Sequence, residues 1–198
     1  MVEKHLRMVV GLGNPGRAYE KSRHNTGFMA VERVAQTYAI RFDQRKFKTV
    51  FGRGRIADTD AMLVKPMDYM NRSGPPVRSL AEYFGVSSKD VLVIHDDIDL
   101  AFGRLKIKEK GGHGGHNGLR SLITAWGGGD FPRLRIGIGR PTNSGHVTGH
   151  VLDRFSEEEL QLLEPIMARA CDAAAVILTL GLTDGMNRFN DKNFLVSR

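Results

Sequence analysis

Apolar positions along the chain follow two spacings, which predict strands and helices in alternation. Continuous apolar runs that end at Val10 and at Ile94 are typical of buried strands. Apolar residues three and four positions apart predict a helix from about Asn25 to Tyr38, and a long amphipathic helix from Glu157 to Leu180 that Ser156 caps. The same two patterns predict strands near residues 47–56, 61–64 and 134–138, and helices near residues 77–84 and 119–126.

Alternation of strands and helices predicts an α/β protein whose sheet carries helices on its faces. The chain has 198 residues, and no linker-like stretch divides it, so we expect one domain over residues 1–198. Its longest uninterrupted apolar run, Ala173 to Leu178, is far shorter than a membrane-spanning helix. The first residues show no secretory signal. We therefore expect a cytoplasmic protein without a membrane partner.

Charge favours a polyanionic partner. The chain carries 29 Lys and Arg against 22 Asp and Glu, a net charge of +7. Alternation of Arg104, Lys106, Lys108 and Lys110 predicts a basic stripe along one face of a strand. Two further basic groups accompany the stripe: Arg41, Arg45, Lys46, Lys48, Arg53 and Arg55, and Arg133, Arg135 and Arg140. Together the three groups indicate a nucleic acid, although composition does not say which one.

The glycine run from Gly11 to Gly16 resembles a dinucleotide-binding loop, because it follows a buried strand. A dinucleotide site needs a helix that begins inside the motif, so that the helix N-terminus meets the pyrophosphate. Here Pro15 interrupts the motif, and helical periodicity starts only after His24. Glu32 has the right sequence distance for a ribose contact but falls inside the first predicted helix. The pattern therefore disfavours a dinucleotide.

Metal and thiol chemistry are also weakly supported. Histidine pairs occur at His113 and His116 and at His146 and His150, but the second pair lies in a predicted loop without a neighbouring metalloprotease glutamate. His113 and His116 fit backbone hydrogen bonding in a glycine-rich turn equally well. Cys171, the only cysteine, lies within a helical apolar pattern and is expected to pack in the core.

The remaining candidates form a hydrolytic constellation at strand ends. His24 follows the first strand and could act as a general base near neutral pH. Asp96 ends a neighbouring buried strand and could orient the imidazole through its other ring nitrogen. Asn14, Asn71 and Asn117 lie in glycine-flanked loops, where their amides could bind a peptide backbone or an oxyanion.

These residues and their spacing resemble the bacterial-type peptidyl-tRNA hydrolases over nearly the whole chain. The resemblance implies a single α/β domain with a twisted mixed sheet and helices around it. It also implies hydrolysis of the ester between a peptide and the terminal ribose of tRNA, without a cofactor or metal. The motifs that carry it are residues 10–16, Tyr19, residues 23–27, Tyr69-Met70-Asn71, His95-Asp96-Asp97, residues 111–118 and residues 133–139.

The resemblance also implies a role for each candidate. His24 would be the catalytic base, Asp96 its orienting partner, and Asn14 would assist in catalysis. The implied substrate-binding residues are Tyr19, Tyr69, Asn71, His113 and Asn117, and the implied ligands of the tRNA 5′ phosphate are Lys108 and Arg135. The expected partner is peptidyl-tRNA, bound through its acceptor stem and 3′ end by a monomer. A non-catalytic RNA-binding protein on the same scaffold remains the alternative.

Overall fold

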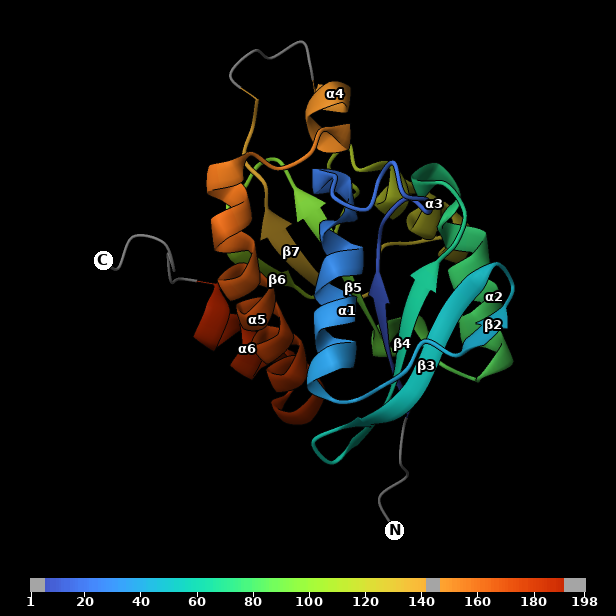
Figure 1. Ribbon diagram of the computed structural model, residues 1–198. Helices are drawn as coiled ribbons and strands as arrows, with labels where there is room; N and C mark the ends of the chain where they lie inside the picture. The colour runs from blue at the N-terminus through green and yellow to red at the C-terminus, as the bar shows by residue number, and fades with distance from the viewer. Residues whose placement is uncertain (1–5, 142–146, 191–198) are drawn as a thin grey trace.

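The computed structural model describes residues 6–141 and 147–190. These residues form one mixed sheet of seven strands in the order β2-β3-β4-β1-β5-β7-β6 (Figure 1). Strands β4, β1, β5 and β7 run parallel, while β2, β3 and β6 pair antiparallel to their neighbours. The strands are β1 (Arg7–Gly11), β2 (Gln44–Lys46), β3 (Thr49–Ile56), β4 (Thr59–Pro66), β5 (Val91–Asp97), β6 (Leu105–Lys108) and β7 (Arg133–Gly137).

Helices cover both faces of the sheet, as Figure 1 shows. One face packs against α1, α5 and α6, and the other packs against α2 and α3, so that two apolar cores lie on either side of the central strands. No helix in the described part of the chain is long and apolar enough to span a membrane. The α-helices are α1 (Thr26–Thr37), α2 (Gly74–Tyr83), α3 (Asn117–Trp126), α4 (Val147–Leu152), α5 (Glu157–Leu180) and α6 (Leu182–Phe189), and the short 3₁₀ helices are η1 (Arg23–Asn25), η2 (Met70–Arg72) and η3 (Ser88–Asp90).

The predicted α/β class is confirmed, and most of the predicted elements are present. Helix α1 begins after His24, and α5 carries the expected capping box between Ser156 and Glu159. Helix α3 ends at Gly127, whose backbone is left-handed with φ 72°. Cys171 lies on α5 and is buried in the core, as its helical pattern predicted.

Three local predictions are wrong. The strand predicted near residues 47–56 begins only at Thr49, because Phe47 and Lys48 form the turn of a β2–β3 hairpin. His150 belongs to the short helix α4 rather than to a loop, and its partner His146 lies outside the described residues. The basic stripe is shorter than predicted, since β6 spans only Leu105–Lys108 and leaves Arg104 and Lys110 beyond its ends.

The parallel strands place several loops at one edge of the sheet. The carboxyl ends of β1, β4, β5 and β7 all lie at the upper edge in Figure 1, below α4. The segment after β1 leads to His24, the segment after β4 leads to Asn71, and β5 carries Asp96 near its own end. Ligand sites of parallel α/β sheets form at this edge.

Candidate active site

A pocket of about 520 Å³ opens at the carboxyl edge of the sheet. It combines residues from five separate segments of the chain, so that only the folded protein contains it. Eight of the ten predicted site residues line this pocket: Asn14, Tyr19, His24, Tyr69, Asn71, Asp96, His113 and Asn117. The other two, Lys108 and Arg135, lie on β6 and β7 outside it.

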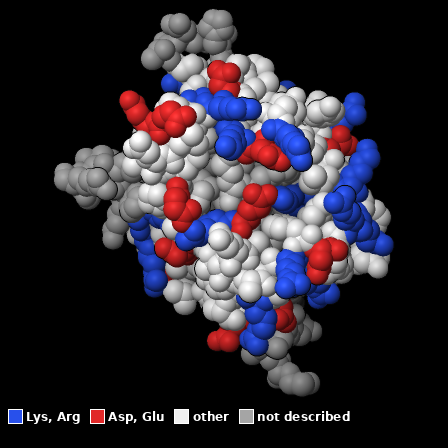
Figure 2. Space-filling view, viewed as in Figure 1, with Lys and Arg blue, Asp and Glu red and all other residues white. Residues whose placement is uncertain are grey.

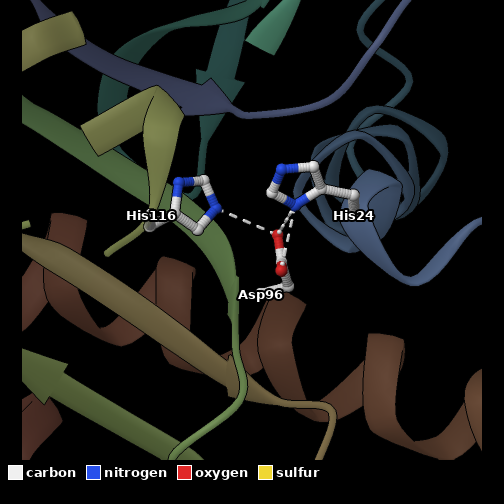
Figure 3. Close-up of side chains that lie close together, drawn as sticks. All are labelled: His24, Asp96 and His116. Atoms are coloured by element: carbon white, nitrogen blue, oxygen red, sulfur yellow. Dashed lines mark hydrogen bonds and ion pairs between the residues drawn. The ribbon is translucent and has the colours of Figure 1, made fainter. Parts of the chain in front are cut away.

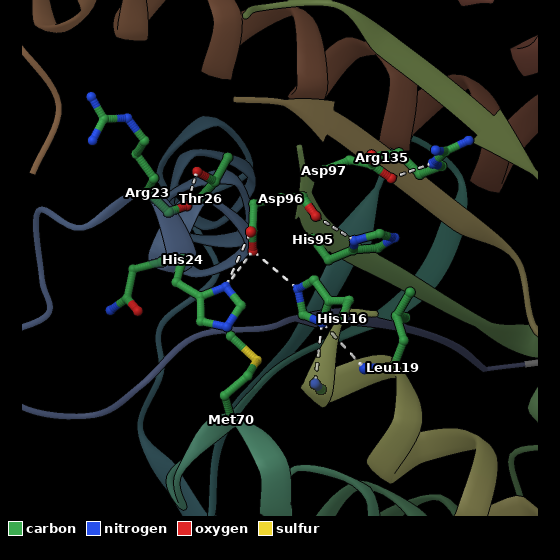
Figure 4. Close-up of polar contacts among 12 residues, drawn as sticks. Arg23, His24, Thr26, Met70, His95, Asp96, Asp97, His116, Leu119 and Arg135 are labelled. Atoms are coloured by element: carbon green, nitrogen blue, oxygen red, sulfur yellow. Dashed lines mark hydrogen bonds and ion pairs between the residues drawn. The ribbon is translucent and has the colours of Figure 1, made fainter. Parts of the chain in front are cut away.

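The buried carboxylate of Asp96 lies between two imidazoles (Figure 3). His24 Nδ1 lies 2.9 Å from Oδ1 and 3.0 Å from Oδ2 of Asp96, and His116 Nε2 lies 3.0 Å from Oδ1. A carboxylate can only accept in these bonds, so both ring nitrogens donate. Nε2 of His24 is therefore left unprotonated in the neutral ring, on the side away from Asp96 (Figure 4).

The two histidines keep Asp96 ionised although it is buried. Burial by itself raises the pKa of this carboxyl. Electrostatic interactions with His24 and His116, together with the hydrogen bonds that they donate, outweigh burial and hold the pKa of Asp96 well below its ordinary value. A fixed negative charge next to His24 stabilises the protonated imidazole that forms when this ring accepts a proton.

The glycine run brings His24 to this position by allowing close backbone contact. A Cβ atom on Gly11 would lie 2.2 Å from the carbonyl oxygen of Gly27, so the end of β1 and the start of α1 touch backbone to backbone. The side chain of Asn25 then joins the two segments, since it accepts a hydrogen bond from Asn14 N at 2.8 Å and donates one to Asn14 O at 2.9 Å. The glycines thus serve helix–strand packing around the pocket.

The three predicted asparagines meet at the pocket from different elements. Asn14 follows β1, Asn71 lies within η2, and Asn117 is the first residue of α3, so the last two are not in the loops predicted for them. Asn14 Oδ1 accepts a hydrogen bond of 2.8 Å from Met70 N, which fastens η2 to the loop after β1. The Nδ2 donor of Asn14 remains for a ligand.

Both histidines of the glycine-rich turn accept backbone hydrogen bonds, which is one of the two interpretations that the sequence left open. His113 Nδ1 accepts from Gly115 N at 3.0 Å. His116 Nδ1 accepts from Gly118 N and Leu119 N at 3.1 and 3.3 Å, so it caps α3. Capping leaves its Nε2–H to donate to Asp96, as Figure 4 shows. Sequence reasoning did not assign His116 to the catalytic group, although its place directly before Asn117 was the available signal.

His95 is buried directly beneath this group. Its Nδ1 donates to the backbone carbonyl of Asp96 at 2.7 Å, and its ring packs edge-on against His116 with centroids 4.9 Å apart. Burial, reinforced by an electrostatic interaction with His116, lowers the pKa of His95 to about 3. His95 is therefore neutral at physiological pH.

His24, Asp96 and His116 also have the composition of a metal site. Their potential ligand atoms all lie within 4.8 Å of one another. The two nitrogens concerned are the ones that donate hydrogen bonds to Asp96, and a metal ion between them would require both rings to lose those protons. In the described structure both ring N–H groups are already used in hydrogen bonds to Asp96.

The basic residues outside the pocket differ from the predicted clusters. Arg133 is buried and donates to the backbone of the glycine-rich turn, including Gly112 O at 2.5 Å, so its role is structural. Arg135 Nε pairs with Asp97 Oδ2 at 2.6 Å, which helps to lower the pKa of Asp97 against the opposing effect of burial. Within residues 6–141 and 147–190, no carboxylate pairs with Lys108, which is exposed. Of the third predicted basic group, Arg133 is therefore held inside the fold and Arg135 is paired with a carboxylate.

An imidazole bonded to a buried carboxylate, at the base of a pocket lined by amide groups, is typical of a hydrolytic enzyme. The sequence profile of the peptidyl-tRNA hydrolase family matches residues 8–196. The peptidyl-tRNA hydrolase of Bacillus subtilis is 42% identical over 187 residues, which cover 94% of this chain and all of that protein. The peptidyl-tRNA hydrolase of Clostridium tetani is 43% identical, over 93% of this chain and 97% of that protein.

The crystal structure of peptidyl-tRNA hydrolase from Acinetobacter baumannii superposes with a TM-score of 0.89 at 38% identity, covering 96% of this chain and 97% of that chain. The chain belongs to the peptidyl-tRNA hydrolase family.

Proposed function

We propose that this protein hydrolyses the ester bond that joins a peptide to the terminal ribose of tRNA, with His24 as general base. The observation that carries the proposal is the His24–Asp96 pair at the base of the pocket, with Nε2 of His24 free to accept a proton. Membership of the peptidyl-tRNA hydrolase family supports the same substrate. Because peptidyl-tRNA is formed where translation takes place, we infer a cytoplasmic location.

The reaction proceeds in two steps. His24 Nε2 takes a proton from water, and the water oxygen attacks the carbonyl carbon of the ester to form a tetrahedral intermediate. Asp96 stabilises the resulting imidazolium and holds the ring in one orientation. The bond between the carbonyl carbon and the ribose oxygen then breaks, and His24 returns the proton to that oxygen. The products are tRNA and a peptide carboxylic acid, which ionises to the carboxylate by releasing the second proton of the water to solvent.

The asparagines bind the substrate around this centre. The free Nδ2 donor of Asn14 and the amides of Asn71 and Asn117 can bind the peptide backbone and the developing oxyanion. One such donor contributes roughly 10²- to 10³-fold in rate when it is positioned in advance. Tyr19, Tyr69 and His113 complete the walls of the pocket and contact the peptide or the terminal nucleoside.

The acceptor stem of tRNA binds at β6 and β7. Asp97, a pocket residue, holds Arg135 at the edge of the catalytic pocket, and Lys108 is exposed further along β6, beside Arg133. We propose that both contact the 5′ phosphate, with the protein acting as a monomer. A cation that binds phosphate displaces counterions and makes binding dependent on salt.

The deciding experiment is turnover of an N-acetylaminoacyl-tRNA by the wild-type protein and the His24→Ala variant, with and without a chelator. The proposal requires activity in the wild type, its near loss in the variant at preserved tRNA affinity, and no effect of the chelator. Binding without turnover in the wild type would favour the non-catalytic RNA-binding alternative. Loss of activity with the chelator would favour a metallohydrolase.

A further inference from the structure

Exposed apolar side chains gather on one side of the catalytic pocket. Of the large hydrophobic residues that the described chain exposes, four lie in neighbouring segments, and we call them the aromatic strip. The aromatic strip consists of Tyr69 (57% exposed), Met67 (37%), Phe47 (43%) and Tyr83 (59%). An exposed apolar surface of this kind marks a binding site more often than isolated apolar residues do.

The aromatic strip is continuous with the pocket. Tyr69 lines the pocket itself. Met67, two residues before it, donates its backbone N–H to the carbonyl of Lys48 at 2.7 Å, which joins this segment to the β2–β3 turn. In that turn Phe47 packs edge-on against Tyr83 at the end of α2, with ring centroids 5.8 Å apart. A ligand that leaves the pocket over Tyr69 therefore meets Met67, Phe47 and Tyr83 next.

The turn that presents Phe47 is conformationally strained. Phe47 and Lys48 have φ angles of 47° and 54°, in the left-handed region that two-residue hairpin turns usually fill with Asn and Gly. A bulky side chain in this region costs roughly 1–2 kcal/mol. Asparagine or glycine would relieve the strain, and the chain instead places an exposed aromatic ring there. A binding role for the ring explains why strain is retained at this exposed position.

The order of the strands assigns the two ends of the substrate to opposite sides of the pocket. The catalytic pair follows β1 and ends β5, and the exposed cation Lys108 lies on β6, beyond β7. The aromatic strip lies beyond β4, on the opposite side of β1 and β5. The ester lies at the catalytic pair, between these two sides. When the tRNA part of the substrate lies at β6 and β7, the peptide part therefore extends the other way, over β4.

We propose that the aromatic strip is a binding track for the peptide part of peptidyl-tRNA, with a preference for apolar and aromatic side chains. The inference rests on the proposed function. From β4 to β2 the track crosses two strand spacings, roughly 10 Å, which corresponds to about three extended residues. A peptide therefore gains contact with Phe47 and Tyr83 only when it extends about three residues or more beyond the pocket.

Positive charge borders the aromatic strip and adds a second preference. Lys46 Nζ lies 4.2 Å from the ring centroid of Tyr83 and 5.1 Å from that of Phe47. Lys48 is exposed and pairs with Asp68. Figure 2 shows Lys and Arg side chains along the right-hand edge, where Figure 1 places β2. Apolar peptides with acidic residues should therefore bind better than basic ones.

A polar groove between α2 and α3 is the competing path for the peptide. It adjoins the pocket at Asn71 and Asn117 and contains Arg120 and Thr124. This groove offers few apolar contacts. It requires a variant of its own in the test.

The experiment compares two substrates, N-acetylaminoacyl-tRNA and a tRNA that carries a peptide of about eight residues with two aromatic side chains, long enough to cross the track. The test variant is Phe47→Asn combined with Tyr83→Ala, because asparagine suits the left-handed turn. We expect kcat/KM for the long substrate to fall about fivefold or more, because its peptide loses apolar contact with the track. We expect kcat/KM for the short substrate to stay within about twofold, because this substrate does not reach the track. Leu180→Ala, which truncates another exposed apolar residue at the end of α5, is the matched control and should change neither value.

Three results would overturn the track. If the test variant leaves kcat/KM for the long substrate unchanged, the aromatic strip does not bind the peptide. An equal loss for both substrates would assign the aromatic strip to the tRNA end of the substrate. A loss that depends on peptide length in Arg120→Ala alone would show that the peptide binds in the polar groove. Failure of the proposed function is distinguishable from these, because it would be seen as undiminished turnover of the short substrate by His24→Ala.

Discussion

The catalytic group and the basic face of β6 and β7 differ in how the fold treats charge. In the catalytic group, the carboxylate of Asp96 is almost fully buried and bonded to two imidazoles. On the basic face, Lys108 is exposed, and Arg135 is held at the border between the two regions by Asp97. Buried charges interact strongly and have fixed geometry, while exposed charges are screened by salt. We therefore expect the first region to govern the rate of chemistry and the second to govern affinity for tRNA.

Substitution of His24 tests this difference most severely. His24→Ala removes the group that accepts the proton of water, so kcat should fall by roughly 10²- to 10⁴-fold. The affinity for tRNA should remain within a few fold, because the cations of β6 and β7 are unchanged. Single-turnover hydrolysis of N-acetylaminoacyl-tRNA measures the first value, and fluorescence titration with tRNA measures the second. If tRNA affinity fell together with kcat, the catalytic group would also govern binding, and the two regions would not differ as we expect.

Replacement of Asp96 should have the next largest effect. In Asp96→Asn the amide oxygen can still accept one hydrogen bond, but the negative charge that stabilises the His24 imidazolium is lost, so kcat should fall roughly 10²- to 10³-fold. If the pair acts as a unit, the double variant with His24→Ala should be no slower than His24→Ala alone. Multiplied losses in the double variant would show that Asp96 acts independently of His24.

On the basic face, Lys108→Ala should weaken tRNA binding several fold and leave kcat unchanged. Loss of one phosphate contact should reduce the slope of log affinity against log salt by about 0.7 to 1. Titrations at several salt concentrations measure this slope. Lys89→Ala, which truncates an exposed lysine in η3 directly before β5, is the matched control and should keep the wild-type slope. Equal slopes for Lys108→Ala and the wild type would remove Lys108 from the tRNA contacts.

The smallest expected effect is on stability. Because His95 is buried in the catalytic group, the free energy of unfolding should depend on pH. The pKa of His95 is about 3 in the fold and about 6.5 in the unfolded chain, so between these values the unfolded state binds the additional proton. His95 therefore lowers the free energy of unfolding by roughly 1 kcal/mol per pH unit as the pH falls below about 6.5. Urea unfolding at pH 7 and pH 5 measures the change, and His95→Asn should reduce it.

His113→Asn provides the comparison for that measurement. This histidine is only half-buried, at the rim of the pocket, so its removal should leave the difference between pH 7 and pH 5 as in the wild type. If both variants alter the difference equally, the effect does not come from burial of His95.

Sequence periodicity predicted the central elements well and the margins poorly. The apolar pattern of α1, β5 and α5 is strong because these elements bury a continuous face in the core. The hairpin turn at Phe47 was missed, because its residues lack the Asn-Gly signal and a strand pattern continues through them. The basic group at Arg133 was misjudged for a related reason: charge in a sequence does not reveal whether the guanidinium faces solvent or the backbone of a buried turn.

The sequence by itself determined the α/β class, the late start of the first helix after the glycine run, and the set of polar residues at the strand ends. Only the tertiary structure decided how these residues pair. Asp96 accepts hydrogen bonds from His24 and His116, Asn14 accepts one from the backbone of the segment that carries Asn71, and Arg135 pairs with Asp97. The partners are far apart in the sequence, so local sequence patterns do not predict these pairings. Periodicity records which face of an element is buried, whereas these pairings depend on strand order and on the close backbone contact of Gly11 with Gly27, which exist only after folding.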